Sequence, residues 1–183
     1  KASGLLVFSG IVIFCFYSFV RLKELLPVEE YGYDAIFFIL LSLCFAWGGD
    51  TCAYFAGRAF GKHKLCPVVS PKKTVEGAIG GVLGTMVFGV LVTVIYSIAA
   101  DRMEEFTRSN IGVSMYVIIA LLACVAAVLG IYGDLFASVV KRQCGIKDYG
   151  TIFPGHGGIL DRFDSVMFIA PFVTMVVIAV FYH

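Results

Sequence analysis

The sequence predicts an all-α, polytopic transmembrane helical bundle of about five spans, with a polar cavity that faces the cytoplasm. Of the 183 residues, 60% are hydrophobic and 15% are charged, whereas a soluble domain carries about a quarter charged residues. The apolar residues form runs of about twenty, which at about 1.5 Å per residue can cross a hydrocarbon core of about 30 Å. The polar residues gather between those runs, mainly in the segments 58–76 and 141–162.

Five runs are long and apolar enough to be spans: 4–20, 35–57, 77–99, 112–140 and 163–182. The first is followed by Arg21 and Lys23 without a small-residue cleavage pattern, so we interpret it as a span and not as a signal peptide. The third begins with small residues, including a Gly77-x-x-x-Gly81 pair, which allow close packing between subunits or within one. No internal repeat divides the chain, which predicts one domain.

The basic residues predict which way the bundle faces. Five spans place the loops alternately on two sides, and ten of the fourteen lysines and arginines then fall on one side. The positive-inside rule makes that side cytoplasmic. The net charge of +1 leaves no basic surplus for nucleic acid, so we expect no nucleic-acid partner. The six cysteines show no Cys-x-x-Cys spacing, which argues against a disulfide framework or a zinc site.

Two acidic residues, Asp50 and Asp134, lie inside predicted spans. An acid at the centre of a transmembrane helix costs about 2.5–3.5 kcal/mol, so such residues usually face a cavity, an ion or a partner. Helical spacing places Asp50 in one polar stripe with Arg58, and Asp134 in another with Ser138 and Lys141. The structural alternative is that these acids only hold the bundle together, Asp50 by pairing with Arg58 or with a lysine of another helix.

The segment 58–76 predicts an anion site at a helix end. Ser70 followed by Pro71 fits an N-cap and the first helical residue, which places Lys72 and Lys73 in the first turn of a helix that enters the membrane. Cations there oppose the helix dipole unless the backbone amides and the ammonium groups hold an anion together. The alternative is contact of these lysines with lipid headgroups.

The segment 138–165 contains the densest mixture of charges in the chain. Its four cations and three acids are Lys141, Arg142, Lys147, Arg162, Asp148, Asp161 and Asp164. Carboxylates bind Mg²⁺ and cations neutralise the remaining phosphate charge, so the mixture predicts a metal–polyphosphate site. Asp161 and Asp164 are three residues apart at the start of a helix, so both can face one way and share a cation with Asp134.

A glycine-rich turn precedes that pair of acids. Gly157 and Gly158 follow His156 and allow backbone amides to approach an anion closely. A loop histidine satisfied by the backbone is the alternative for His156. No second histidine stands at ligand spacing, so a zinc site is not predicted.

This last segment resembles the signature of CDP-diacylglycerol synthases, also called phosphatidate cytidylyltransferases. In this sequence the signature comprises Ser138, Lys141-Arg142, Lys147-Asp148, His156-Gly157-Gly158 and Asp161-Arg162-Phe163-Asp164. The stretch 47–81 also resembles the family, and the two motifs together cover about a third of the chain. Family members usually have additional N-terminal spans. The resemblance therefore implies that residues 1–183 are a single transmembrane catalytic domain, either the C-terminal part of a longer member or a shortened member.

The resemblance implies transfer of the cytidylyl group of CTP to phosphatidate, a membrane lipid, which gives CDP-diacylglycerol and pyrophosphate and requires Mg²⁺. It implies Asp134 and Asp161 as metal ligands, with Asp164 supporting them or a second cation such as K⁺. The catalytic residues it implies are Asp134, Lys147, Asp148, Asp161, Arg162 and Asp164. The substrate-binding residues it implies are Ser70, Lys72, Lys73, Ser138, Lys141, Arg142, His156, Gly157 and Gly158. It also implies a homodimer.

Short loops and the lack of a transit segment favour a bacterial plasma membrane, with an organelle membrane as the alternative; the active site is expected on the cytoplasmic face. Two other functions fit parts of the pattern. An ion-coupled transporter would use the intramembrane acids as ion or proton carriers, but has less reason to concentrate cations and acids in one loop. A CTP-dependent polyprenol kinase would transfer the γ-phosphate instead of the cytidylyl group. The reaction products distinguish these three possibilities.

Overall fold

The computed structural model describes residues 2–102, 112–146, 148–150 and 158–181, with side chains from Phe8 onward. The helices are α1 (Ala2–Leu25), α2 (Val28–Tyr31), α3 (Asp34–Phe60), α4 (Val75–Arg102), α5 (Val113–Gln143) and α6 (Val166–Phe181). A 3-10 helix, η1 (Leu160–Arg162), precedes α6. Two short strands, β1 (Lys64–Cys66) and β2 (Ser70–Thr74), form an antiparallel hairpin between α3 and α4.

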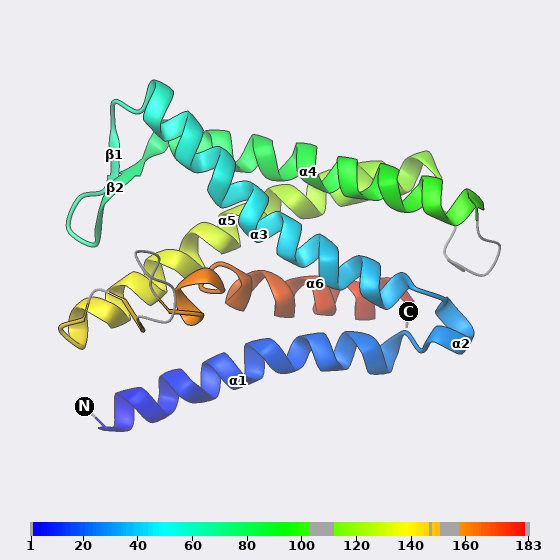
Figure 1. The fold of residues 1–183 in the computed structure, drawn as a ribbon, viewed down its shortest axis with the longest axis horizontal. Helices are drawn as coiled ribbons and strands as arrows, with labels where there is room; N and C mark the ends of the chain where they lie inside the picture. The colour runs from blue at the N-terminus through cyan, green and yellow to red at the C-terminus, as the bar shows by residue number, and fades with distance from the viewer. Residues whose placement is uncertain (1, 103–111, 147, 151–157, 182–183) are drawn as a thin grey trace.

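The five long helices occupy the five predicted spans and run in alternating directions through the bundle (Figure 1). Within the described residues, α3, α4 and α5 are long and apolar enough to cross a membrane, while α6 is apolar but has 16 residues. The prediction of an all-α, polytopic membrane bundle is confirmed. The N-terminus, the hairpin and the end of α5 all lie at the same end of the bundle (Figure 1).

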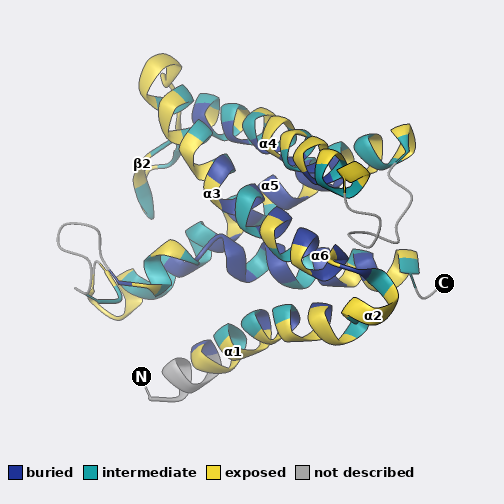
Figure 2. Cartoon of the chain, turned by 45° about the vertical axis from the view of Figure 1, so that its right-hand side comes forward, coloured by how far each residue is buried: buried dark blue, intermediate teal, exposed yellow. Residues whose placement is uncertain are grey.

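Helix α6 lies at the centre of the packing, in contact with α1, α3 and α5. Its side chains Ile169 and Val173 are fully buried, as is Phe45 of α3. Much of α6 carries the dark blue of buried residues in Figure 2. The outer faces expose large apolar side chains instead, such as Val87 on α4 and Leu121 on α5. Apolar side chains on the outside suit contact with lipid tails, because the bilayer and not water is then their solvent.

Glycines allow α3 and α4 to pack closely. A Cβ atom added to Gly77 would lie 2.8 Å from the carbonyl oxygen of Ala53, and one added to Gly81 would lie 3.0 Å from the Cβ of Ala53. The small-residue pair predicted from the sequence therefore serves helix packing within this chain. This close approach fixes the position of the hairpin, which joins the two helices at one end (Figure 1).

The predicted N-cap at Ser70 and helix start at Pro71 are wrong. Ser70 is not an N-cap, because it pairs with Cys66 in the hairpin and begins strand β2. The helix begins at Val75, and the backbone N–H of Gly77 donates to the Oγ1 of buried Thr74 at 3.1 Å. Thr74 provides the same capping chemistry four residues later, since its hydroxyl satisfies an amide of the first turn. Lys72 and Lys73 consequently lie on a strand that leads into the helix.

Candidate active site

A cavity of about 560 Å³ lies at the end of the bundle that carries the hairpin. Its walls come from α3, β2, the start of α4, α5 and the segment from η1 to α6. The charged residues that line it are Asp50, Asp134, Asp148, Asp161, Asp164, Arg58, Lys72, Lys73, Lys141 and Arg162. Carboxylates and cations in equal number suit a polyanion that binds together with a metal ion.

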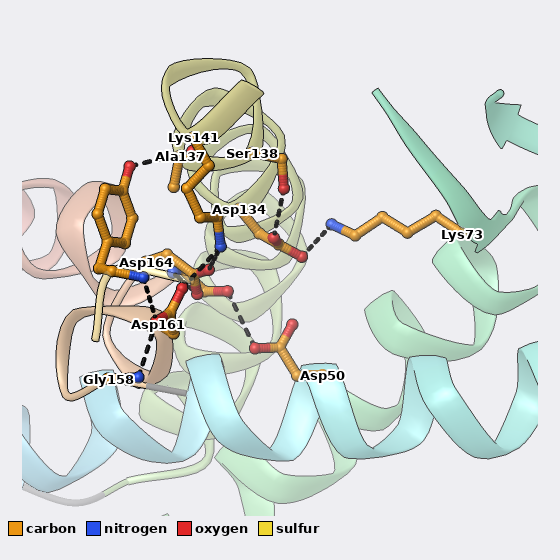
Figure 3. A network of polar contacts seen from close by, with 11 residues as sticks. Asp50, Lys73, Asp134, Ala137, Ser138, Lys141, Gly158, Asp161 and Asp164 are labelled. Atoms are coloured by element: carbon orange, nitrogen blue, oxygen red, sulfur yellow. Dashed lines mark hydrogen bonds and ion pairs between the residues drawn. The ribbon is translucent and has the colours of Figure 1, made fainter. Parts of the chain in front are cut away.

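Helix α5 places Asp134 in the lining of this cavity, and Figure 3 shows it between Lys73 and Ser138. Its carboxylate forms an ion pair with the ammonium of Lys73, which reaches it from β2, and accepts a hydrogen bond from the Oγ of Ser138 at 3.4 Å. Both side chains of the ion pair are about three-quarters buried, with relative exposures of 24%. Asp134 and Ser138 thus share a polar face of α5, as the helical spacing predicts. Lys73 of the hairpin contacts this face at Asp134.

Asp161 accepts three hydrogen bonds and organises the segment before α6 (Figure 3). The Lys141 ammonium lies 2.9 Å from its Oδ1, and the backbone amides of Tyr149 and Gly158 lie 2.8 and 2.9 Å from its Oδ2. Burial acts to raise the pKa of Asp161, but these donors outweigh it and hold the pKa below its ordinary value. This carboxylate is therefore ionised at neutral pH.

Tyr149 fastens the same segment to the bundle. Its hydroxyl donates to the carbonyl oxygen of Ala137 at 3.0 Å, and its ring stacks on Phe8 of α1 with 5.5 Å between centroids. Burial raises the pKa of the phenol to about 12, and the negative charges of Asp161 and Asp164 act in the same direction. The tyrosine thus remains neutral and keeps its proton for the hydrogen bond.

Asp164, in the turn between η1 and α6, and Asp50, on α3, both line the cavity. The ammonium of Lys141 lies 3.9 Å from Asp164, so one cation faces both acids of the predicted pair Asp161 and Asp164. The Oγ of Ser165 donates to Asp50 at 2.9 Å. Gly133 of α5 allows the backbone at Asp164 to pack closely against this helix, because a Cβ added at position 133 would lie 2.7 Å from the carbonyl oxygen of Asp164.

Asp50 does not pair with Arg58, which is one of the two kinds of partner that the structural alternative named. The guanidinium of Arg58 donates instead to the hydroxyl of Tyr54 at 3.4 Å, one turn away on the same helix. Asp50 joins α3 to the start of α6 through Ser165, and its carboxylate also lines the cavity. It is therefore part of the polar site as well as of the packing.

A second cavity, of about 590 Å³, adjoins the first, because Asp50, Asp161 and Arg162 line both. Its remaining lining residues are Trp47, Thr51, Ile159 and Phe163. The indole N–H of Trp47 donates to the carbonyl oxygen of Arg162 at 2.9 Å, which ties α3 to η1. The surface of this cavity is mainly apolar, and Trp47 in its lining is about half exposed.

Most of the site residues predicted from the sequence meet in the first cavity. Those that line it are Lys72, Lys73, Asp134, Lys141, Asp148, Asp161, Arg162 and Asp164. Ser138 and Gly158 contribute hydrogen bonds to two of these acids. Ser70 and Arg142 are described but are not part of its lining. Lys147, His156 and Gly157 lie outside the described residues.

The donor atoms in the cavity suit Mg²⁺, because that ion prefers carboxylate oxygens. Among the described residues, however, no group of three His, Cys, Asp or Glu side chains is close enough to hold a metal ion. The carboxylates of Asp134 and Asp161 are instead paired with Lys73 and Lys141. The carboxylates of the cavity are thus of the chemical type that binds Mg²⁺. In this structure, lysine side chains neutralise two of them.

Several contacts of the site were not predicted. Ser165 bonds to Asp50 across 115 positions of the sequence, and no local pattern marks such a pair. The backbone amide of Tyr149 donates to Asp161, and the indole of Trp47 donates to the carbonyl oxygen of Arg162. Both contacts depend on the tertiary fold, and no sequence motif marks them. Thr74 did carry a signal, since a threonine three residues before a glycine in a helical run fits an N-cap.

The sequence matches the Cytidylyltransferase family over residues 2–180. A protein of Bacillus subtilis (strain 168) named phosphatidate cytidylyltransferase is 36% identical over 171 residues, which cover 93% of this chain and 56% of that protein. Proteins with the same name from Staphylococcus haemolyticus and Staphylococcus epidermidis are 39% and 42% identical over 145 residues, which cover 79% of this chain and 50% of each. The chain spans about half the length of the curated relatives it matches.

Proposed function

The chain belongs to the Cytidylyltransferase family, and on this premise we propose that it transfers the cytidylyl group of CTP to phosphatidate. The products are CDP-diacylglycerol and pyrophosphate, for phospholipid biosynthesis. The observation that carries the proposal is the cavity in which five carboxylates and five cations meet at one end of a membrane-spanning bundle. A soluble polyanion and a membrane lipid can both reach such a place. The names of the relatives support the same substrates.

The reaction needs little acid–base help from the protein. The phosphomonoester of phosphatidate, with a second pKa of about 6, is already largely ionised at neutral pH. Its oxygen attacks the α-phosphorus of CTP, a new P–O bond forms, and the bond between the α-phosphorus and the bridging oxygen of pyrophosphate breaks. The obstacle is repulsion between anions, so catalysis consists mainly of positioning and charge neutralisation.

Four of the five cations of the cavity form two pairs that come from different elements. Lys72 and Lys73 reach it from β2, while Lys141 and Arg162 come from α5 and η1. We assign Lys141 and Arg162 to the triphosphate and the pyrophosphate leaving group. Lys72 and Lys73 bind either that group or the headgroup of phosphatidate. The remaining predicted binders, Ser70, Ser138, Arg142, Lys147, His156, Gly157 and Gly158, stay predictions for the same two substrates.

Mg²⁺ is the proposed cofactor, and Asp134, Asp161 and Asp164 are its proposed ligands. When bound, the ion neutralises phosphate charge and orients the triphosphate. Lys73 and Lys141, which now neutralise two of these carboxylates, are placed to turn to phosphate oxygens. Asp148 lines the same cavity, and a second cation such as K⁺ remains a proposal of the same kind.

The second cavity suits entry of the lipid. It connects the exposed indole of Trp47 on the flank of the bundle with Arg162 and Asp50 at the edge of the polar cavity. An amphiphile could lie there with its apolar part along Trp47 and Phe163 and its phosphate toward Arg162. We propose that the polar cavity faces the cytoplasm of a bacterial plasma membrane and that the protein is a homodimer.

Incorporation of radiolabelled CTP into lipid tests the proposed function. The chain, reconstituted in vesicles that contain phosphatidate, should convert α-labelled CTP into labelled CDP-diacylglycerol and release pyrophosphate, and chelation of Mg²⁺ should stop both. Asp134→Asn should abolish turnover, whereas Glu24→Gln, in an exposed ion pair with Arg21, serves as the control. Release of CDP with a phosphorylated lipid would indicate a kinase instead. Absence of any CTP chemistry would refute the proposal.

A further inference from the structure

Strand β2 brings Lys73 to Asp134, yet the hairpin that carries this strand projects from the bundle (Figure 1). Only short strands form it, and a register irregularity lies between Lys64 and Cys66. A two-stranded hairpin is marginally stable by itself in water. The position of the Lys73 ammonium therefore depends on what fastens the base of the hairpin to the helices.

Glu76 in the first turn of α4 makes such a fastening. Its carboxylate accepts the backbone N–H of His63 at 3.2 and 3.3 Å, and its Oε1 lies 2.6 Å from the Nδ1 of the His63 ring. The backbone N–H of Val75 donates to the carbonyl oxygen of His63 at 3.0 Å. His63 directly precedes β1 and α4 directly follows β2, so these bonds join the two ends of the hairpin.

Thr74 completes the base on the inner side. Its hydroxyl accepts the amide of Gly77, and its side chain is buried against the glycines at positions 57 and 61 of the α3 end. Lys73 is the next residue toward the hairpin tip. The contact of Glu76 with His63 and the contact of Thr74 with Gly77 thus both hold the end of β2. This end lies next to Lys73, which enters the cavity.

Glu76 itself is absent from the described lining of the cavity. Its side chain is one-quarter exposed, and its described partners belong to the hairpin and not to the acids and cations of the site. It therefore differs from Asp134 and Lys73, which face the cavity directly.

We propose that Glu76 is a positioning residue that holds strand β2 through His63 so that the Lys73 ammonium faces Asp134 across the cavity. The proposal rests on the proposed function for its kinetic consequence, but the fastening itself can be measured without any activity. Misplacement of a substrate-binding group by about 1 Å can reduce a rate on the order of 100-fold. We expect Glu76→Ala to lower the rate of cytidylyl transfer, measured at limiting concentrations of both CTP and phosphatidate, by about 10-fold or more.

A double-mutant cycle separates positioning from general damage to the fold. If Glu76 acts through Lys73, Glu76→Ala should cost less than about 2-fold once Lys73→Met is present, because the group it positions is gone. In a Lys141→Met background, the same change should keep its full cost, because Lys141 lies on α5 and not on the hairpin. Equal costs of Glu76→Ala in all three backgrounds would overturn the proposal.

Amide hydrogen exchange tests the fastening without reference to activity. Glu76→Ala should accelerate exchange of the Val75 amide by about 10-fold, the factor for a loss of about 1.4 kcal/mol, while Lys73→Met should leave it unchanged. Unchanged exchange in Glu76→Ala would refute the proposal even if the chain proved inactive with CTP. Should Glu76→Ala fail to fold, His63→Ala removes the imidazole while leaving the backbone bond. His63→Ala should lower the rate less than Glu76→Ala does, and this loss should likewise shrink once Lys73→Met is present.

Discussion

Replacement of Asp161 by asparagine tests the electrostatic organisation of the site. The side chain of Asp161 is 9% exposed and that of its partner Lys141 is 11% exposed. Three donors, the ammonium and the amides of Tyr149 and Gly158, converge on its two oxygens at 2.8–2.9 Å. Asparagine has nearly the same shape but offers one oxygen and one NH₂ group, so at least one donor would meet another donor.

The expected loss follows from these contacts. A hydrogen bond to a charged group contributes about 1.5–3 kcal/mol, and breaking a buried ion pair costs about 3–5 kcal/mol. Because the pair keeps some contact with solvent, we expect a loss of about 3 kcal/mol for local opening of this segment. Each 1.4 kcal/mol is a factor of ten, so the amides of Tyr149 and Gly158 should exchange about 100-fold faster.

Hydrogen exchange of these two amides in detergent micelles measures this loss directly. Asp148→Asn is the matched control, since Asp148 is an exposed acid one residue before Tyr149. It should leave both amides within about 3-fold of the original exchange rate, which corresponds to less than 0.7 kcal/mol. Exchange in Asp161→Asn that equals the rate in Asp148→Asn would refute the assignment of Asp161 as the organising charge.

Further predictions concern pH and helix packing. Because the pKa of Asp161 is lowered in the folded state, its contribution to stability is complete above the ordinary value of about 3.9 and is lost as the pH falls through the lower folded value. Protection of the Tyr149 amide should therefore hold from about pH 7 to 5 and begin to fall only below about pH 4. The pKa of Tyr149 is raised to about 12, so spectrophotometric titration should find one tyrosine that ionises near that pH, and Tyr149→Phe should remove it. Gly77→Ala should destabilise the α3–α4 contact by about 1–3 kcal/mol, measured by SDS unfolding, because its Cβ would meet a backbone oxygen at 2.8 Å. Gly10→Ala, where nothing lies within 4 Å, is the control, and an equal loss there would contradict this account of the packing.

The long apolar runs and the charged signature were readable from the sequence because each is a local pattern. A run of about twenty apolar residues has one stable arrangement in lipid, a helix whose backbone bonds are all satisfied internally. Asp134, Ser138 and Lys141 share a helix, so their common face follows from helical spacing alone. The start of α4 was misread because Ser70 and Thr74 can both act as caps, and only hairpin pairing decides between them.

The sequence by itself determined that this is a bundle of apolar helices, which residues carry charge, and that most of these lie between the spans. Only the tertiary structure decided which charges meet. The ion pairs of Lys73 with Asp134 and of Lys141 with Asp161, and the bond of Ser165 to Asp50, join segments far apart in the chain. Such pairings follow from how closely glycine-lined helices approach and from where the hairpin is fastened, and no local periodicity contains that information.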